Sequence, residues 1–172
     1  MSQVSTSLTY LTAYPEQIQT QVRQLLAQEK LAQYLLQKYP NAHTLRSDKD
    51  LYTYVLDLKN EHIKNADGIA KVAYDNKLHV IKNALGTHTY ISRIQGGKLK
   101  AKHEIRIATL FKTAPAEFLN MIVVHELAHL KEKDHNKSFY QLCRYMQSDY
   151  HQVELDLRVY LTHLDHGGET LW

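Results

Sequence analysis

The sequence has little cysteine, proline or glycine and lacks a long apolar run. A single cysteine, Cys143, among 172 residues excludes an internal disulfide. Three prolines and six glycines exclude the collagen-like and low-complexity classes. The longest strongly apolar stretch near the middle of the chain is residues 121–124, whereas a membrane-spanning helix needs about 20 apolar residues. The first residues also lack the basic and apolar segments of a secretory signal, so we expect a cytoplasmic protein without a membrane span.

An excess of charge of one sign is also missing. The 21 basic and 18 acidic residues leave a net charge of +3, which is too small to indicate nucleic-acid binding by itself. Hydrophobic residues make up 44% of the chain and charged residues 23%, which is a globular composition. A chain of 172 residues suits one domain, or one core with a helical extension. The unusual numbers are 11 histidines and 12 tyrosines, so the question is whether the histidines are organised.

Hydrophobic periodicity predicts helices towards both ends of the chain. Residues 15–39 carry apolar side chains at steps of three and four, which indicates one amphipathic helix. Ser47 and Asp50 have the spacing of a capping box, which predicts a second helix from Ser47 onwards. Three later helices are predicted over residues 113–133, 138–147 and 150–164, with Asp149 as the N-cap of the last, before a tail at residues 163–172.

Between these helices the hydrophobic period changes to that of strands. Strands are predicted over residues 69–74, 77–81, 90–94 and 99–110. Asp75-Asn76 and Gly96-Gly97 predict tight turns between neighbouring strands. We therefore expect an α+β fold, in which a small antiparallel sheet packs against the helix at 113–133 and helices lie at both ends. Residues 1–68 form an N-terminal helical region packed on the core, residues 69–172 form that core and its tail, and together they make one compact unit.

Residues 125–129 read His-Glu-Leu-Ala-His, an HExxH pattern inside the predicted helix. Four residues at about 100° each bring His129 to within roughly 40° of His125 and one turn further along, so both imidazoles can reach one ion. Glu126 lies off the same edge of the helix, where it can accept a proton from a metal-bound water. The pattern therefore predicts one zinc ion, with His125 and His129 as ligands and Glu126 as the general base.

A catalytic zinc needs a third protein ligand and an open position for water. His135 follows His129 with five residues between them, and in a continuous helix its side chain would be rotated roughly 120° away. We therefore expect the helix to end near Lys133, with Asn136 or Asp134 capping the next helix, so that His135 folds back towards the metal. This spacing equals that of the metzincin pattern, except that a glutamate occupies the position of the turn glycine.

Glu154 is a rival third ligand, because other HExxH peptidases recruit a glutamate from a later helix. It follows His129 by 25 residues and could project from the last helix, but it could equally be a solvated helix charge. We favour His135 because it is local. The remaining histidines show no comparable spacing, and we expect most of them to be structural or exposed: His43, His62, His79, His88, His103, His151, His163 and His166.

Several segments together resemble a known family. They are Arg93, Ala114-Pro115, the His-Glu-Leu-Ala-His-Leu run from His125, and the His-Asn-Lys-Ser-Phe run from His135. This part of the chain resembles the YgjP-like zinc metallopeptidases, which are related to the WLM and SprT families. The similarity covers about residues 90–164 and is strongest over residues 115–140. Many members also carry a Trp-Gly-Ser-Cys segment, which is absent here.

The resemblance implies a zincin-like minimal metallopeptidase fold. It also implies His125, His129 and His135 as the zinc ligands and Glu126 as the catalytic acid/base. The expected enzyme is thus a zinc metallopeptidase that hydrolyses bonds in a peptide or protein substrate through a metal-activated water. An extended substrate could pair with the edge of the sheet, and we expect that edge at residues 105–110. The sequence does not single out the oxyanion-stabilising residue, the cleavage specificity or the oligomeric state.

Two other classes of function stay open. SprT relatives are linked to DNA, and Lys98, Lys100 and Lys102 alternate onto one face of a predicted strand, where they could contact phosphates. A solubilising strand face explains the same pattern, since no aromatic residues are interleaved with these lysines. The other class is a non-catalytic structural zinc protein, against which the presence of Glu126 and of only three evident ligands argues.

Overall fold

The computed structural model describes residues 7–78, 92–96 and 102–172. Its helices are α1 (Glu16–Ala27), α2 (Leu31–Lys38), α3 (Asp48–His62), α4 (Ala116–Ala128), α5 (Lys137–Met146) and α6 (Tyr150–Asp165). Its strands are β1 (Gly68–Asp75), β2 (Ser92–Gly96) and β3 (Lys102–Ala108). The α+β class predicted from the sequence is confirmed, whereas the division of the chain at residue 68 stays a prediction.

The three strands form one mixed sheet in the order β1-β3-β2. β2 runs antiparallel to β3, as predicted for the two sides of the Gly96-Gly97 turn. β1 runs parallel to β3, with Val72 opposite Ile105. The sheet therefore differs from the antiparallel sheet that we predicted, because β1 pairs with a strand distant in sequence. β3 also lies in the centre, so the prediction of a free substrate-binding edge at residues 105–110 is wrong.

A turn follows β1, as predicted for Asp75-Asn76. The side chain of Asp75 accepts a hydrogen bond of 2.8 Å from the backbone N–H of Lys77, as expected for an aspartate in a tight turn. Most of the return strand predicted at residues 77–81 lies outside the described residues, as do His79, His88, Lys98, Lys100 and the side chain of Lys102.

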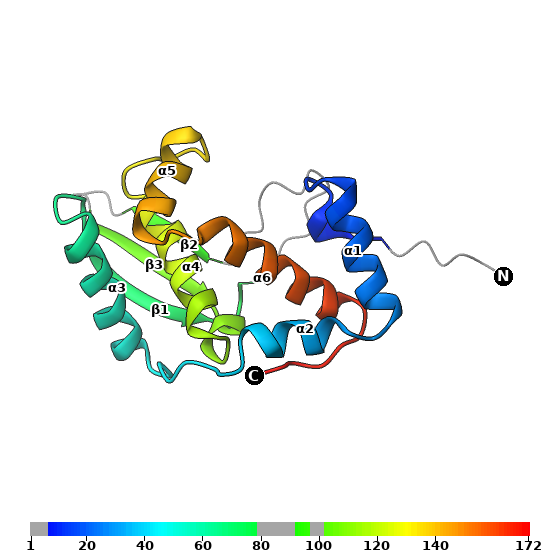
Figure 1. Cartoon of the computed structure of the whole chain (residues 1–172). Helices are drawn as coiled ribbons and strands as arrows, with labels where there is room; N and C mark the ends of the chain where they lie inside the picture. The colour runs from blue at the N-terminus through cyan, green and yellow to red at the C-terminus, as the bar shows by residue number, and fades with distance from the viewer. Residues whose placement is uncertain (1–6, 79–91, 97–101) are drawn as a thin grey trace.

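The amphipathic segment predicted as one helix at residues 15–39 is divided into α1 and α2. Glu29 has a φ of 56°, in the left-handed region, and so ends the α-helical path. The backbone N–H of Lys30 bonds to the carbonyl of Leu25, and that of Glu29 to the carbonyl of Leu26, which is the pattern of a Schellman C-cap. The two helices thus diverge, and α2 packs against α6 while α1 packs on α2 (Figure 1).

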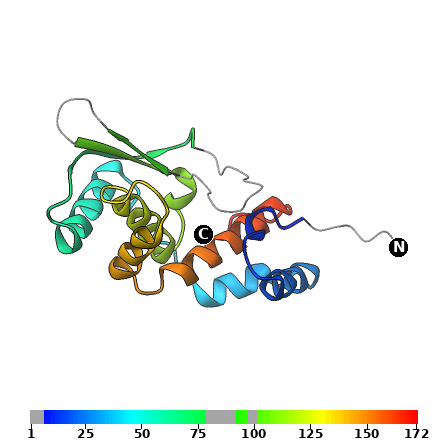
Figure 2. The same ribbon diagram turned by 90° about the horizontal axis from the view of Figure 1, so that it is seen from above.

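The sheet covers one side of a helical layer. Seen from above, the strands lie along one side of α3 and α4, while α6 leads away from this layer to α1 and α2 (Figure 2). α3 packs against β1, and α4 packs against β2, β3, α5 and α6. The start of α3 confirms the predicted cap, because the Oγ of Ser47 accepts the backbone N–H of Asp50 at 3.0 Å.

The last residues of the chain pack on the helical layer. The indole N–H of Trp172 donates to the backbone carbonyl of Tyr39 at 2.7 Å, and its ring contacts Phe118 and Tyr160. The predicted tail therefore begins only after α6 and is anchored at its end.

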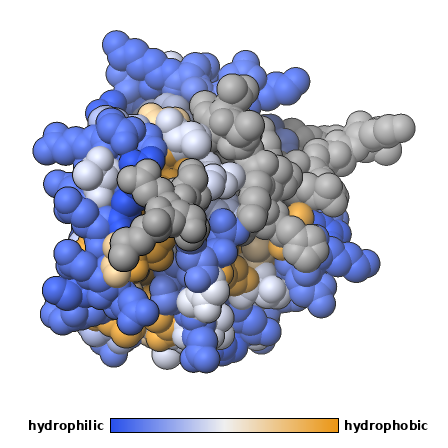
Figure 3. All heavy atoms as spheres, turned by 90° about the vertical axis from the view of Figure 1, so that its right-hand side faces the viewer, coloured by the Kyte–Doolittle hydropathy of each residue, from blue (hydrophilic) through white to orange (hydrophobic). Residues whose placement is uncertain are grey.

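The described residues include no helix that is both long and apolar enough to cross a bilayer. On the face seen from the α1 side, apolar residues show in patches among hydrophilic ones (Figure 3).

Candidate metal centre

α4 is the helix that carries the HExxH residues. It begins after Pro115, whose missing N–H costs nothing in a first turn, and its C-cap is His129. Buried apolar residues occupy nearly all of its faces, because it is enclosed by α5, α6 and the sheet. This packing fixes His125 and His129 one turn apart, and Glu126 between them is only 3% exposed. All three lie on one rigid, central element.

A chain reversal after α4 brings His135 back to the same place. α4 ends at Ala128, earlier than the predicted end near Lys133, and turn-type bonds then run as far as the N–H of Glu132, which bonds to the carbonyl of Ala128 at 2.9 Å. Asn136 caps α5, since its side-chain oxygen accepts the backbone N–H of Phe139 at 2.9 Å. The predicted cap by Asn136 is confirmed, and His135 stands directly before it.

The three imidazoles converge through the same ring nitrogen. The Nε2 atoms of His125, His129 and His135 lie 3.2, 3.1 and 3.1 Å from one another. A tetrahedral zinc ion with bonds of about 2.0–2.1 Å to nitrogen separates its ligand nitrogens by about 3.3 Å, which is close to this spacing. Three imidazole nitrogens are also a favoured donor set for zinc. The residues therefore fit one metal ion.

The opposite ring nitrogens of two of these histidines have partners. Nδ1 of His125 lies 2.8 Å from the hydroxyl of Tyr150, and Nδ1 of His129 lies 3.0 Å from the backbone carbonyl of Glu132. A carbonyl oxygen only accepts, so Nδ1 of His129 carries the proton and its Nε2 keeps the lone pair. This arrangement prepares Nε2 for a metal.

Phe139 packs against all three imidazoles. Its ring centroid lies 4.9, 4.6 and 4.8 Å from those of His125, His129 and His135, and its side chain is fully buried. The benzyl ring thus fills the space beside the cluster and restricts rotation of the imidazoles. Cys143, one turn further along α5, is also buried, and this burial raises the pKa of its thiol to about 12. A neutral thiol with that pKa is a poor metal ligand.

Glu154, the rival ligand, does not join the histidines. One of its carboxylate oxygens accepts a hydrogen bond of 3.0 Å from the hydroxyl of Tyr150, whose oxygen in turn faces His125. Tyr150 is fully buried, and this burial, together with the charge of Glu154, raises the pKa of its hydroxyl well above the usual range. Tyr150 is thus a neutral phenol placed between a carboxylate and an imidazole.

The structure therefore brings together the three histidines predicted from sequence, with Glu126 beside them on α4. Sequence reasoning missed Phe139 and Tyr150, which it treated as helix residues only. One signal was present: Tyr150 precedes Glu154 by four residues in the predicted last helix, so the two side chains share one face of it. No such signal pointed to Phe139, because His135 lies before the start of α5.

Comparison with known proteins shows which family the chain resembles. The model of the YgjP-like metallopeptidase domain matches residues 92–160, a range that includes all the residues of the cluster. A relative from Escherichia coli (strain K12), named UTP pyrophosphatase, is 59% identical over 161 residues, which cover 94% of this chain and 96% of the relative. No solved structure matches the chain.

Proposed function

We propose that the chain, which belongs to the YgjP-like metallopeptidase family, is a zinc-dependent hydrolase. Its proposed substrate is a nucleoside triphosphate, and UTP is the one to be tested first. The observation that carries the proposal is the convergence of three Nε2 atoms at 3.1–3.2 Å beside a buried carboxylate. The choice of UTP rests on the printed name of the relative that is 59% identical to this chain over 161 residues.

Each residue of the cluster has a role in the proposed reaction. His125, His129 and His135 would hold the ion, which when bound lowers the pKa of a water towards about 7 and polarises a substrate oxygen. Glu126 accepts the proton that the attacking water loses. Phe139 keeps the imidazoles in place and excludes solvent from one side of them.

The proposed reaction converts UTP and water into UMP and pyrophosphate. The water oxygen forms a bond to the α-phosphorus, while the bond from that phosphorus to the bridging oxygen breaks. The electron pair of the broken bond leaves with pyrophosphate, and the proton of the water passes to Glu126.

The test compares the full-length protein with its Glu126→Gln variant. Purified protein is stripped with a chelator, reloaded with zinc and incubated with UTP, and the products are separated as UMP, UDP, pyrophosphate and phosphate. We expect UMP and pyrophosphate from the zinc-loaded wild type only. Glu126→Gln should retain zinc and lose about 10²–10⁴-fold in rate, because the general base is gone.

Glu117→Gln is the matched control. Glu117 lies in the exposed first turn of the same helix, so the same substitution there should leave zinc content and rate unchanged. A zinc-loaded Glu126→Gln enzyme with the rate of the wild type would overturn the assigned role of Glu126. A zinc-loaded wild type that releases no UMP and pyrophosphate would overturn the choice of substrate.

Peptide hydrolysis is the second candidate. It is favoured by the HExxH spacing and by the metallopeptidase domain whose family model matches the chain. The same ion and the same Glu126 would then act on a peptide carbonyl. Parallel incubation with a mixture of fluorogenic peptides separates the two candidates, because cleavage that requires both zinc and Glu126, in the absence of UTP turnover, favours the peptidase.

A further inference from the structure

We propose that Glu154 is a positioning residue that acts through Tyr150 on His125. The inference rests on the metal site proposed above and extends it by one chain of hydrogen bonds. The two contacts are 3.0 Å between the carboxylate of Glu154 and the hydroxyl of Tyr150, and 2.8 Å between that hydroxyl and Nδ1 of His125. In this arrangement the three histidines remain the metal ligands, and Glu154 affects the metal site only through Tyr150 and His125.

The directions of these hydrogen bonds follow from the donors available. A phenol has one proton, and the carboxylate of Glu154 only accepts, so the hydroxyl of Tyr150 donates to Glu154. The oxygen of Tyr150 is then an acceptor, and Nδ1 of His125 donates to it. His125 is therefore held as the tautomer whose Nε2 carries the lone pair, and the negative carboxylate increases the basicity of that nitrogen.

A residue from the N-terminal part of the chain also lies near this carboxylate. Burial, and after it the charge of Glu154, raises the pKa of the half-buried Tyr14 hydroxyl. The guanidinium of Arg158, one turn further along α6, lies 5.9 Å from the centre of the Tyr14 ring. Glu154 is thus half-buried, bonded to the phenol of Tyr150 and near that of Tyr14, which is unlike a solvated helix charge.

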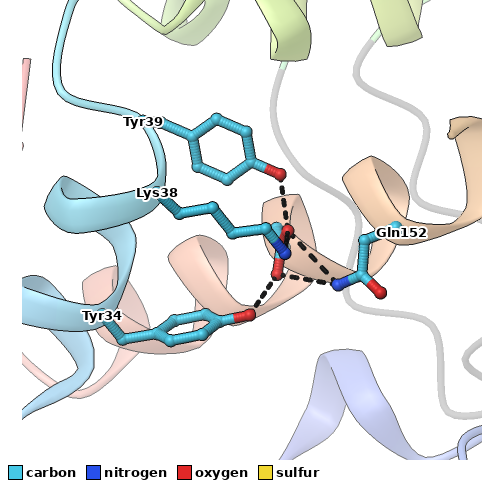
Figure 4. Close-up of polar contacts among 5 residues, drawn as sticks. Tyr34, Lys38, Tyr39 and Gln152 are labelled. Carbon is cyan, nitrogen blue, oxygen red and sulfur yellow. Dashed lines mark hydrogen bonds and ion pairs between the residues drawn. The ribbon is translucent and has the colours of Figure 1, made fainter.

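α6 itself is fixed to the N-terminal helices close to Glu154. Asp156 is fully buried and accepts hydrogen bonds from Tyr34 at 2.8 Å and Tyr39 at 2.5 Å, with the ammonium of Lys38 at 2.7 Å (Figure 4). These partners come from α2 and its C-cap. Residues of α2 and its C-cap, which lie outside the matched family domain, therefore help to fix the helix that carries Tyr150 and Glu154.

The test measures zinc affinity of the full-length protein by competition with a fluorescent chelator. Tyr150→Phe removes the hydroxyl and keeps the ring, while Glu154→Gln keeps the shape and removes the charge. Each should weaken zinc binding by about 10–100-fold, the usual effect of losing such a partner of a metal-binding histidine. Tyr145→Phe is the matched control, because Tyr145 is a 65% exposed tyrosine on α5 that takes no part in this chain of hydrogen bonds, and it should leave the affinity within about twofold of wild type.

A second measurement separates positioning from general destabilisation. In ¹⁵N-histidine spectra of the zinc-loaded protein, the Nδ1 proton of His125 should be protected from exchange in wild type and in Tyr145→Phe. It should exchange rapidly in Tyr150→Phe. Zinc affinities of Tyr150→Phe and Glu154→Gln within twofold of wild type would overturn the proposal, whatever substrate the enzyme hydrolyses. A wild type that binds no zinc would instead overturn the metal site itself.

Discussion

The buried carboxylate of Asp156 offers a stability prediction that can be worked out from the structure. Asp156 is fully buried, and Tyr34, Tyr39, Lys38 and Gln152 all point their polar atoms at its two oxygens (Figure 4). Replacement by asparagine keeps the volume but removes the charge and turns one acceptor oxygen into an NH₂ donor. In either orientation of the amide, one tyrosine hydroxyl then faces a donor in place of an acceptor.

The expected cost combines one charge-assisted hydrogen bond that is lost and a second that keeps its acceptor but loses the charge. At about 1.5–3 kcal/mol for the first and about 0.5–1 kcal/mol for the second, the two tyrosine bonds together amount to about 3 kcal/mol. The ammonium of Lys38 adds little, because its side chain is 37% exposed and can be hydrated by water in the variant. In a protein of this size, about 3 kcal/mol corresponds to a decrease of about 6–12 °C in Tm.

Thermal and urea unfolding of the metal-free protein measure this cost directly. Asp149→Asn is the control, since Asp149 is exposed, stands at the N-cap of the same helix and makes no capping hydrogen bond, so its replacement should change stability by less than about 0.5 kcal/mol. The reasoning would be refuted by an Asp156→Asn variant that loses less than about 1 kcal/mol, because the hydrogen bonds would then contribute no more than solvent-exposed ones.

Three further predictions concern other parts of the fold. His43 is buried, and this burial lowers the pKa of its imidazole below the usual 6.5. As the pH falls, the unfolded chain therefore binds this proton before the folded chain does, and stability should decrease below about pH 6.5. The difference between the Tm values at pH 7.5 and pH 5.5 should be larger for wild type than for His43→Gln. Since burial raises the pKa of Cys143 to about 12, a thiol reagent at pH 8 should fail to label the native protein and label one thiol after unfolding in guanidinium; rapid labelling of the native protein would contradict the described packing. Ser47→Ala should cost about 1 kcal/mol, measured by urea unfolding, because the cap on Asp50 is lost, and an unchanged midpoint would count against that cap.

The local parts of the site could be predicted from the sequence. His125 and His129 follow from helical geometry alone, because four residues make about one turn. His135 required one further step, namely that the helix must end before it, and the cap by Asn136 shows where the next helix begins. The helix nevertheless ends earlier than predicted, at Ala128, because the following backbone N–H groups form hydrogen bonds of the turn type. No residue type in this segment indicates such a turn.

The features that depend on contacts between residues distant in sequence could not be predicted from local sequence patterns. The aspartate turn after β1 was identified correctly, but β1 pairs with β3 across the sheet, and parallel partners leave no mark on short-range periodicity. The break between α1 and α2 is made by Glu29 in a left-handed conformation, where glycine is the usual residue. The role of Tyr150 emerges only when α6 lies beside α4, so its sequence position gave no reason to connect it with His125.

The most direct test of the central claim is the zinc content of the His135→Ala variant compared with that of wild type and Glu154→Gln, each equilibrated with excess zinc and then freed of unbound metal. We expect one zinc ion per chain in wild type and loss of stoichiometric zinc in His135→Ala. Glu154→Gln should also carry one ion, because excess zinc still saturates a site whose affinity is weakened by about 10–100-fold. A His135→Ala protein that keeps one ion per chain, while Glu154→Gln loses it, would contradict the three-histidine site and transfer the third position to Glu154.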